Sequence, residues 1–255
     1  MLFIAILSAT IIAQVTKPPE FSDATKVQSA KPAALETTSH ASAERAELHQ
    51  GLLHQLRNLP GYAGGVAMIE KRLNGPAEDW FAKQNLPLGV AVVRLLNGRE
   101  AESAEMLCAL ARSPKPPLGL IAVMGESIGA SKAQAPKMLE AMQKLASQGD
   151  ATSQYALGLA HLRQTEPQLE AGLSHLREAA KLAPLDTRAL MEIAKQETIL
   201  EHREVAVAAL VEALKRDEKL AAAHYRLSQL YRVMGQPERA SQHMQRYKEL
   251  IATSR

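Results

Sequence analysis

The sequence is poor in cysteine, in aromatic residues and in long hydrophobic runs. Its 255 residues include one cysteine, Cys108, and only 4% are Phe, Trp or Tyr. A single cysteine forms no internal disulfide, so the folded part must be held together by its core. The apolar run at residues 1–13 is shorter than the about 20 residues that cross a bilayer. No segment alternates β-branched and polar residues, so the sequence predicts an all-α protein without a transmembrane span.

Sequence signatures of catalysis and metal binding are also absent. The eight histidines are scattered without an HExxH pattern, and no serine lies in a nucleophile elbow. Gly64-Gly65 follows no strand and precedes no Gly-Lys-Ser, so it predicts close helix packing rather than a phosphate loop. We therefore predict no enzyme, no cofactor and no metal site. An enzyme that uses a histidine in a helical groove, such as His161 or His224, stays open as an alternative.

What the sequence does contain is a helical pattern, clearest in residues 221–250. Two short amphipathic helices are separated by a Gly-Gln-Pro turn, and their apolar residues recur at spacings of three and four. These residues are Leu227, Leu230, Tyr231 and Met234, followed by Ala240, Met244 and Tyr247. One such hairpin buries too little apolar surface to be stable alone, so stacked neighbours are expected.

Matching patterns recur towards the N-terminus. A small residue marks each second helix, at Ala104, Ala135, Gly172, Ala206 and Ala240, with spacings of 31, 37, 34 and 34 residues. Spacing this regular predicts a stack of about five helical hairpins.

These residues resemble the signature of the tetratricopeptide repeat (TPR) family. The matching positions are Gly158, Gly172, Ala179, Pro184, Ala194, Ala206, Ala213, Leu227, Tyr231, Gly235, Ala240 and Tyr247. The sequence departs from the family at Glu201, where a turn glycine is usual, and at Glu197, where an aromatic residue is usual. Residues 151–186 have a longer turn around Pro167 and also resemble Sel1-like repeats. The resemblance implies a right-handed α-solenoid over residues 85–255.

Three segments precede this repeat domain. Residues 1–13 are predicted to be a signal peptide with cleavage after Ala13, although a buried helix or a different start stays open. Residues 14–42 are rich in Pro, Ser, Thr, Ala and Lys, which predicts a disordered linker. Residues 43–84 are predicted to form N-terminal helices, either a degenerate repeat or a cap. Trp80 is expected to pack at that end of the solenoid.

Basic residues are concentrated in the last repeat. Residues 221–255 contain six Lys or Arg and two Glu, against a formal net charge of +3 for the whole chain. Such a surface could attract an acidic protein segment, an anionic lipid or nucleic acid. A polar, solvated face on the terminal repeat is the simpler interpretation, and nucleic acid is not expected for an exported chain.

The resemblance also implies where a partner would bind, because the first helix of each hairpin lines a concave groove in this family. The matching positions are Tyr155, Leu159, Leu162, Arg163, Met191, Lys195, Thr198, Tyr225, Gln229 and Arg232. The Lys and Asn clamp that grips a C-terminal carboxylate in some members is not reproduced. We expect a noncatalytic protein-binding scaffold that is exported to the periplasm or the cell exterior. A cytoplasmic regulator or co-chaperone is the alternative if residues 1–13 are not a signal, and self-association through an incomplete cap also stays open.

Overall fold

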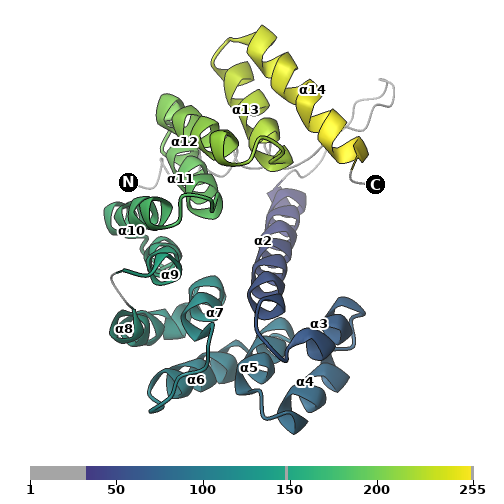
Figure 1. The fold of residues 1–255 in the computed structure, drawn as a ribbon, viewed down its shortest axis with the longest axis vertical. Helices are drawn as coiled ribbons and strands as arrows, with labels where there is room; N and C mark the ends of the chain where they lie inside the picture. Colours follow the sequence, from purple (N-terminus) through teal and green to yellow (C-terminus); the bar gives the residue numbers. More distant parts are fainter. Residues whose placement is uncertain (1–32, 147–148, 254–255) are drawn as a thin grey trace. The chain divides into compact units, whose positions relative to one another are not determined.

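The computed structural model describes residues 33–146 and 149–253, in which all regular structure is helical and no strand occurs (Figure 1). The predicted signal peptide and residues 14–32 of the predicted linker lie outside this part. The helices are α2 (Ala33–Arg57), α3 (Ala63–Glu70), α4 (Asn74–Lys83), α5 (Pro87–Leu96), α6 (Glu100–Ala111), α7 (Leu120–Ser127), the short 3-10 helix η1 (Lys132–Gln134), α8 (Ala135–Leu145), α9 (Ala151–Leu162), α10 (Leu169–Leu182), α11 (Arg188–Ile199), α12 (Arg203–Arg216), α13 (Ala221–Val233) and α14 (Pro237–Thr253). Helix α2 therefore begins inside the segment that was predicted to be a linker.

Helices that follow one another pack as hairpins, and five of these pairs match the predicted repeats. The pairs are α5–α6, α7–α8, α9–α10, α11–α12 and α13–α14. The small residues that marked the repeats, Ala104, Ala135, Gly172, Ala206 and Ala240, lie in the second helix of each pair, and all five are buried. They are buried because a small side chain lets neighbouring helices approach closely. The all-α hairpin-repeat fold predicted from the sequence is confirmed.

The described residues divide into two compact units, one of residues 45–146 and 149–184, the other of residues 185–253 together with 33–44. In the first unit one continuous cluster of buried side chains extends from Leu52 to Ala160. Helices α3 and α4 contribute Val66, Ile69 and Phe81 to this cluster. The segment at residues 43–84, predicted to be either a degenerate repeat or a cap, thus shares its core with the hairpins that follow it.

Phe81 is the centre of packing among α3, α4 and α5. Its side chain is completely buried. A Cβ atom on Gly65 would lie 2.2 Å from the Phe81 ring, and one on Gly89 would lie 2.3 Å from it. The ring fits because neither glycine has a side chain. Trp80 is half-buried, and its ring lies 5.3 Å from that of Phe81, so the packing roles predicted for Trp80 and Gly65 are confirmed.

Several helices end in the same way, with one residue in the left-handed conformation and a hydrogen bond that spans five residues. Gly235 has φ of 70°, and the Gln236 N–H donates to the Tyr231 carbonyl at 2.8 Å. One repeat earlier, Glu201 has φ of 61°, and the His202 N–H donates to the Glu197 carbonyl at 2.9 Å. Such ends satisfy carbonyl groups that the helix leaves unpaired. Glu201 therefore adopts the backbone conformation of the turn glycine that it replaces.

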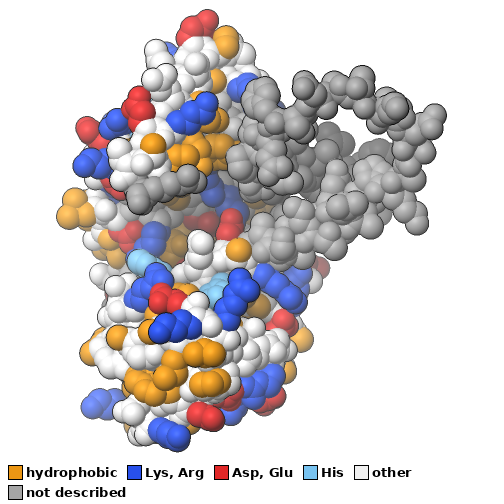
Figure 2. Space-filling view, turned by 90° about the vertical axis from the view of Figure 1, so that its right-hand side faces the viewer, with side chains coloured by type: hydrophobic (Ala, Val, Ile, Leu, Met, Phe, Trp, Pro, Cys, Tyr) orange, Lys and Arg blue, Asp and Glu red, His pale blue; other side chains and the backbone are white. Residues whose placement is uncertain are grey.

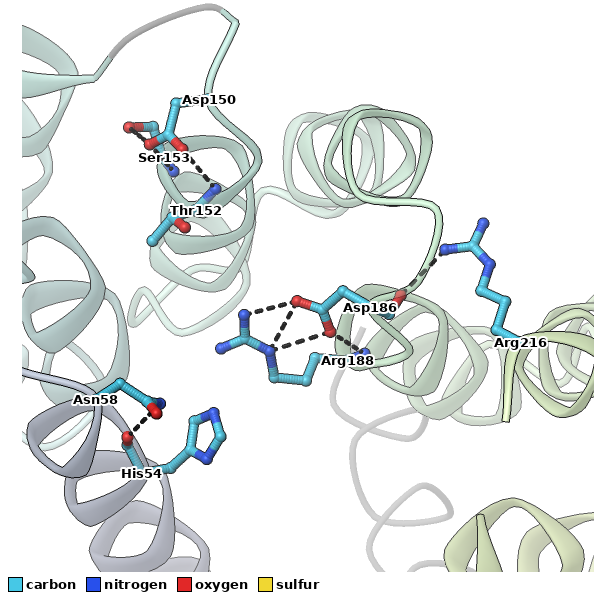
Figure 3. A network of polar contacts seen from close by, with 8 residues as sticks. All are labelled: His54, Asn58, Asp150, Thr152, Ser153, Asp186, Arg188 and Arg216. Atoms are coloured by element: carbon cyan, nitrogen blue, oxygen red, sulfur yellow. Dashed lines mark hydrogen bonds and ion pairs between the residues drawn. The ribbon is translucent and has the colours of Figure 1, made fainter. Parts of the chain in front are cut away.

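Side chains also cap individual helices. Asp150 accepts hydrogen bonds from the backbone N–H groups of Thr152 at 3.2 Å and Ser153 at 2.8 Å, which begins α9 (Figure 3). At the other end of a helix, the Asn58 side chain donates to the His54 carbonyl at 2.9 Å, beyond the last turn of α2 (Figure 3). Both contacts pair backbone groups that a helix end leaves exposed.

Candidate functional site

The groove positions predicted on α9 are mostly part of the core. Leu159 is 1% exposed and Leu162 is 7% exposed, whereas Tyr155 is half-buried. Leu162 packs against Gly172 of α10, where a Cβ atom would lie 2.6 Å from its Cγ. The two leucines therefore stabilise the α9–α10 hairpin, and in this conformation their side chains cannot reach a partner.

Arg163, the last groove position predicted from α9, binds the end of α7. Its Nη1 donates to the backbone carbonyls of Gly125 at 3.2 Å and Glu126 at 2.9 Å, and to Glu126 Oε2 at 3.1 Å. The Glu126 side chain is only 8% exposed. A cation is favourable at a helix C-terminus because carbonyl groups there carry partial negative charge. Arg163 thus joins α9 to α7, a role that sequence spacing could not reveal because Glu126 lies 37 residues away.

The groove positions on α11 stay at the surface. Met191, Lys195 and Thr198 are all half-exposed, and their spacing of four and three residues places them on one helix face. Thr198 Oγ1 donates to the Ala194 carbonyl at 2.7 Å, and Lys195 Nζ lies 3.9 Å from Glu192 Oε1. This face therefore presents an apolar side chain, a cation and a hydroxyl group side by side.

On α13 the three predicted positions have different environments. Tyr225 is half-buried against Tyr247 of α14, with ring centroids 5.1 Å apart, and burial raises the pKa of its hydroxyl. Gln229 is buried, and its Oε1 accepts a hydrogen bond from the exposed Arg232. An Arg226 N–H reaches the Met191 carbonyl at 3.5 Å, which brings α13 beside α11. Arg232 is thus the groove candidate on α13 that is most open to solvent.

A polar network orients the loop before α11. The Asp186 carboxylate accepts from the Arg188 backbone N–H at 2.9 Å and from Arg188 Nη2 at 2.6 Å, while Arg216 Nη1 donates to the Asp186 carbonyl at 3.0 Å (Figure 3). Each charged group has a partner within the network. These bonds hold the loop against the start of α11 and the end of α12.

Two pairs of histidines join the two helices of a hairpin. The rings of His161 and His175 stack with centroids 5.3 Å apart, and each Nδ1 bonds a glutamine side chain at 2.8 Å. In the last hairpin His224 Nδ1 lies 2.9 Å from His243 Nδ1. The His224 Nε2–H donates to the Glu218 carbonyl at 3.1 Å, so the neutral His224 ring accepts a hydrogen bond from the His243 Nδ1–H.

Burial lowers the pKa of both His175 and His243, and the partner imidazole lowers it further in each pair. Both rings therefore favour the neutral form at neutral pH. Across residues 33–146 and 149–253, no three His, Cys, Asp or Glu side chains are arranged to hold a metal ion. The same residues include no helix with the length and hydropathy needed to cross a membrane.

Larger apolar side chains are exposed at separate places on the described surface. The most exposed are Leu185 at 88%, Leu118 at 73% and Val233 at 62%. On the face drawn in Figure 2, Lys, Arg, Asp and Glu side chains are interspersed with groups of hydrophobic side chains. Isolated apolar residues of this kind are usual on protein surfaces, so they do not by themselves define a binding site.

The helix packing described above defines an all-α, TPR-like helical-repeat protein. No protein-family model matches the sequence, and no curated protein matches it. Among solved structures, the chain is similar to one described as "Crystal structure of MamA", with 14% sequence identity, a TM-score of 0.43, and coverage of 74% of this chain and 95% of that chain. The fold assignment rests on the packing of the hairpins in this chain.

Proposed function

We propose that the chain is a noncatalytic protein-interaction module that binds an extended peptide or a partner helix on the first helices of its hairpins. The observation that carries this proposal is the half-exposed face of α11, formed by Met191, Lys195 and Thr198. On the neighbouring α13, Arg232 adds an exposed cation to the partly exposed Lys195. An apolar anchor flanked by cations suits a partner segment with a hydrophobic residue and acidic neighbours.

Site-specific photocrosslinking tests this proposal. A photoreactive amino acid at position 191 or 198 should crosslink to a discrete partner in cells that produce the full chain. The same group at Val211, which is exposed on the second helix α12, is the matched control. Crosslinks of equal strength from all three positions would rule out a first-helix binding surface.

For localisation, we propose export directed by residues 1–13, which lie outside the described part of the chain. The support is their apolar composition and the polar segment that follows them. N-terminal sequencing of the mature protein should find a chain that begins at Gln14. An intact Met1 in a cytoplasmic fraction would instead favour the alternative, a cytoplasmic regulator or co-chaperone.

We also propose that the hairpin α9–α10 is a Sel1-like variant of the repeat. Its connection runs from residue 163 to residue 168, whereas the connection between α11 and α12 runs from residue 200 to residue 202. If the extra length is only a variation on the same repeat, the hairpin does not need it to fold. A variant in which this connection is two residues shorter should therefore still fold. Far-ultraviolet circular dichroism and thermal unfolding of the deletion variant would measure this.

A further inference from the structure

A second surface lies between α6 and α8, which are second helices of their hairpins and do not belong to the first-helix surface proposed above. The hollow between them has a volume of about 470 Å³. It is lined by Ala104, Glu105, Cys108, Arg112, Gln134, Lys137, Glu140, Ala141 and Lys144. The Ser131 hydroxyl donates to the Glu100 carbonyl at 3.3 Å, which holds the segment that leads into α8 beside the start of α6.

The charges around this hollow are not balanced by their neighbours. Lys144 Nζ lies 2.6 Å from Glu140 Oε1, so these two residues neutralise each other. Arg112 and Lys137 are exposed, and neither makes a salt bridge within the part of the chain that the structure describes. Glu105 contributes one negative charge. An occupant that brings carboxylates would therefore gain two cation partners.

The two cations without a salt bridge among the described residues line the same hollow as the thiol of Cys108. This side chain is 9% exposed. Burial raises the pKa of the thiol, and the charges of Arg112 and Lys137 both act in the opposite direction. Arg112 follows Cys108 by four residues, which places both on one face at the end of α6, and Lys137 lines the same hollow from α8. A carboxylate that enters the hollow would therefore share it with both cations.

The remaining lining favours a polypeptide over a bulky or flat occupant. Ala141 is partly exposed and has a short side chain, so a partner backbone could approach α8 closely, whereas Ala104 is buried at the floor of the hollow. The volume lies in the range of about 300–1,000 Å³ that is typical of ligand sites. A membrane surface could contact the exposed ends of Arg112 and Lys137, but it would not enter the hollow to cover Cys108.

We propose that the hollow between α6 and α8 binds an acidic peptide segment of a partner protein, with a Glu or Asp carboxylate held between Arg112 and Lys137. The binding surface is separate from α11 and α13, so failure of the first-helix proposal would leave this one unaffected.

Cys108 is the only cysteine of the chain, so its alkylation reports on this hollow without any engineered probe. The full chain is treated with the neutral reagent iodoacetamide, with or without a capped peptide of alternating Glu and Ala. At a concentration giving two-thirds occupancy, the peptide should slow alkylation about threefold by mass action. A peptide of alternating Lys and Ala should leave the rate unchanged.

The double variant R112E/K137E should lose the protection by the acidic peptide. Its own alkylation rate will fall because added carboxylates raise the pKa of a nearby thiol, so each variant is compared with and without peptide. The variant K71E/K83E changes two exposed lysines, one directly after α3 and one at the end of α4, by the same charge and should keep the protection.

Four results would overturn the proposal. The first is an unchanged alkylation rate at millimolar acidic peptide, and the second is full protection of R112E/K137E. The third is protection by vesicles of anionic phospholipid but not by the acidic peptide, which would assign the surface to a membrane. The fourth is loss of protection in K71E/K83E as well, which would show that the peptide responds to net charge alone.

Discussion

Gly158 of α9 and Gly172 of α10 lie against each other, so that each α-carbon faces the backbone carbonyl of the other. A Cβ atom on Gly158 would lie 3.1 Å from the Gly172 oxygen, and one on Gly172 would lie 3.2 Å from the Gly158 oxygen. Leu176 covers the first glycine, and Leu162 covers the second. The hairpin is thus held by close backbone contact and by two leucines that fill the adjoining space.

Replacement of Gly158 by alanine should destabilise the protein. Its Cβ would lie 2.7 Å from Leu176 Cγ, and overpacking of this kind costs about 1–3 kcal/mol. Alanine favours a helix over glycine by up to about 1 kcal/mol, which offsets part of this cost. We therefore expect the free energy of unfolding in urea to fall by about 1–2 kcal/mol. Gly75→Ala in α4 is the matched control, because no atom lies within 4 Å of the added Cβ. Equal effects at the two positions would contradict the close packing.

Glu201→Gly should stabilise the protein. An L-residue in the left-handed conformation is strained by about 1–2 kcal/mol, and the greater freedom of glycine in the unfolded chain offsets about 0.5–1 kcal/mol of the gain. The ion pair with Arg203, at 3.9 Å between exposed groups, contributes little. The reciprocal change Gly235→Ala, at φ of 70° with open space around it, should destabilise by about 1 kcal/mol. Thermal unfolding should therefore give a higher unfolding temperature for Glu201→Gly and a lower one for Gly235→Ala than for the natural chain.

Acidification should weaken the histidine pairs. Because the pKa values of His175 and His243 are lowered in the folded state, the unfolded chain binds protons more readily, and stability falls as pH falls below about 6.5. The groups that face these rings are His161 and Gln154 for His175, and His224 and Tyr231 for His243, with Arg239 beyond Tyr231.

The double variant H175F/H243F removes the two imidazole groups whose pKa is lowered in the folded state, and it keeps an aromatic ring at each position. Its unfolding temperature should fall less between pH 7.5 and pH 5.0 than that of the natural chain. His54→Gln, at an exposed site on α2, should retain the natural dependence. Parallel pH profiles for all three proteins would show that the histidine pairs do not set the acid response.

Removal of the charge on Arg163 should leave the Glu126 carboxylate buried without a cation. Arg163→Met keeps most of the aliphatic stem, and loss of a buried ion pair costs about 3–5 kcal/mol. Glu126→Gln in the Arg163→Met background should recover part of that loss. A double-mutant cycle in urea measures the coupling, and strictly additive effects would mean that the two side chains act independently.

The sequence by itself determined the repeated architecture of this protein. Helical spacing and small residues at regular intervals, from Ala104 to Ala240, predicted the hairpins, because an α-helix places every third or fourth residue on one face. The left-handed turn is also encoded locally, since Gly235 permits it without strain. Glu201 shows that the local preference can be overridden where the neighbouring helices already dictate the turn.

Only the tertiary structure decided which side chains are available to a partner. Leu159 and Met191 were both predicted to lie in a groove, yet Leu159 is in the core and Met191 is half-exposed. The bond of Arg163 to Glu126, the contact of His224 with His243, and the hollow that Cys108 of α6 shares with Lys137 of α8 each involve two separate helices. Such arrangements depend on how helices pack against one another, and the period of a single helix contains no information about that packing.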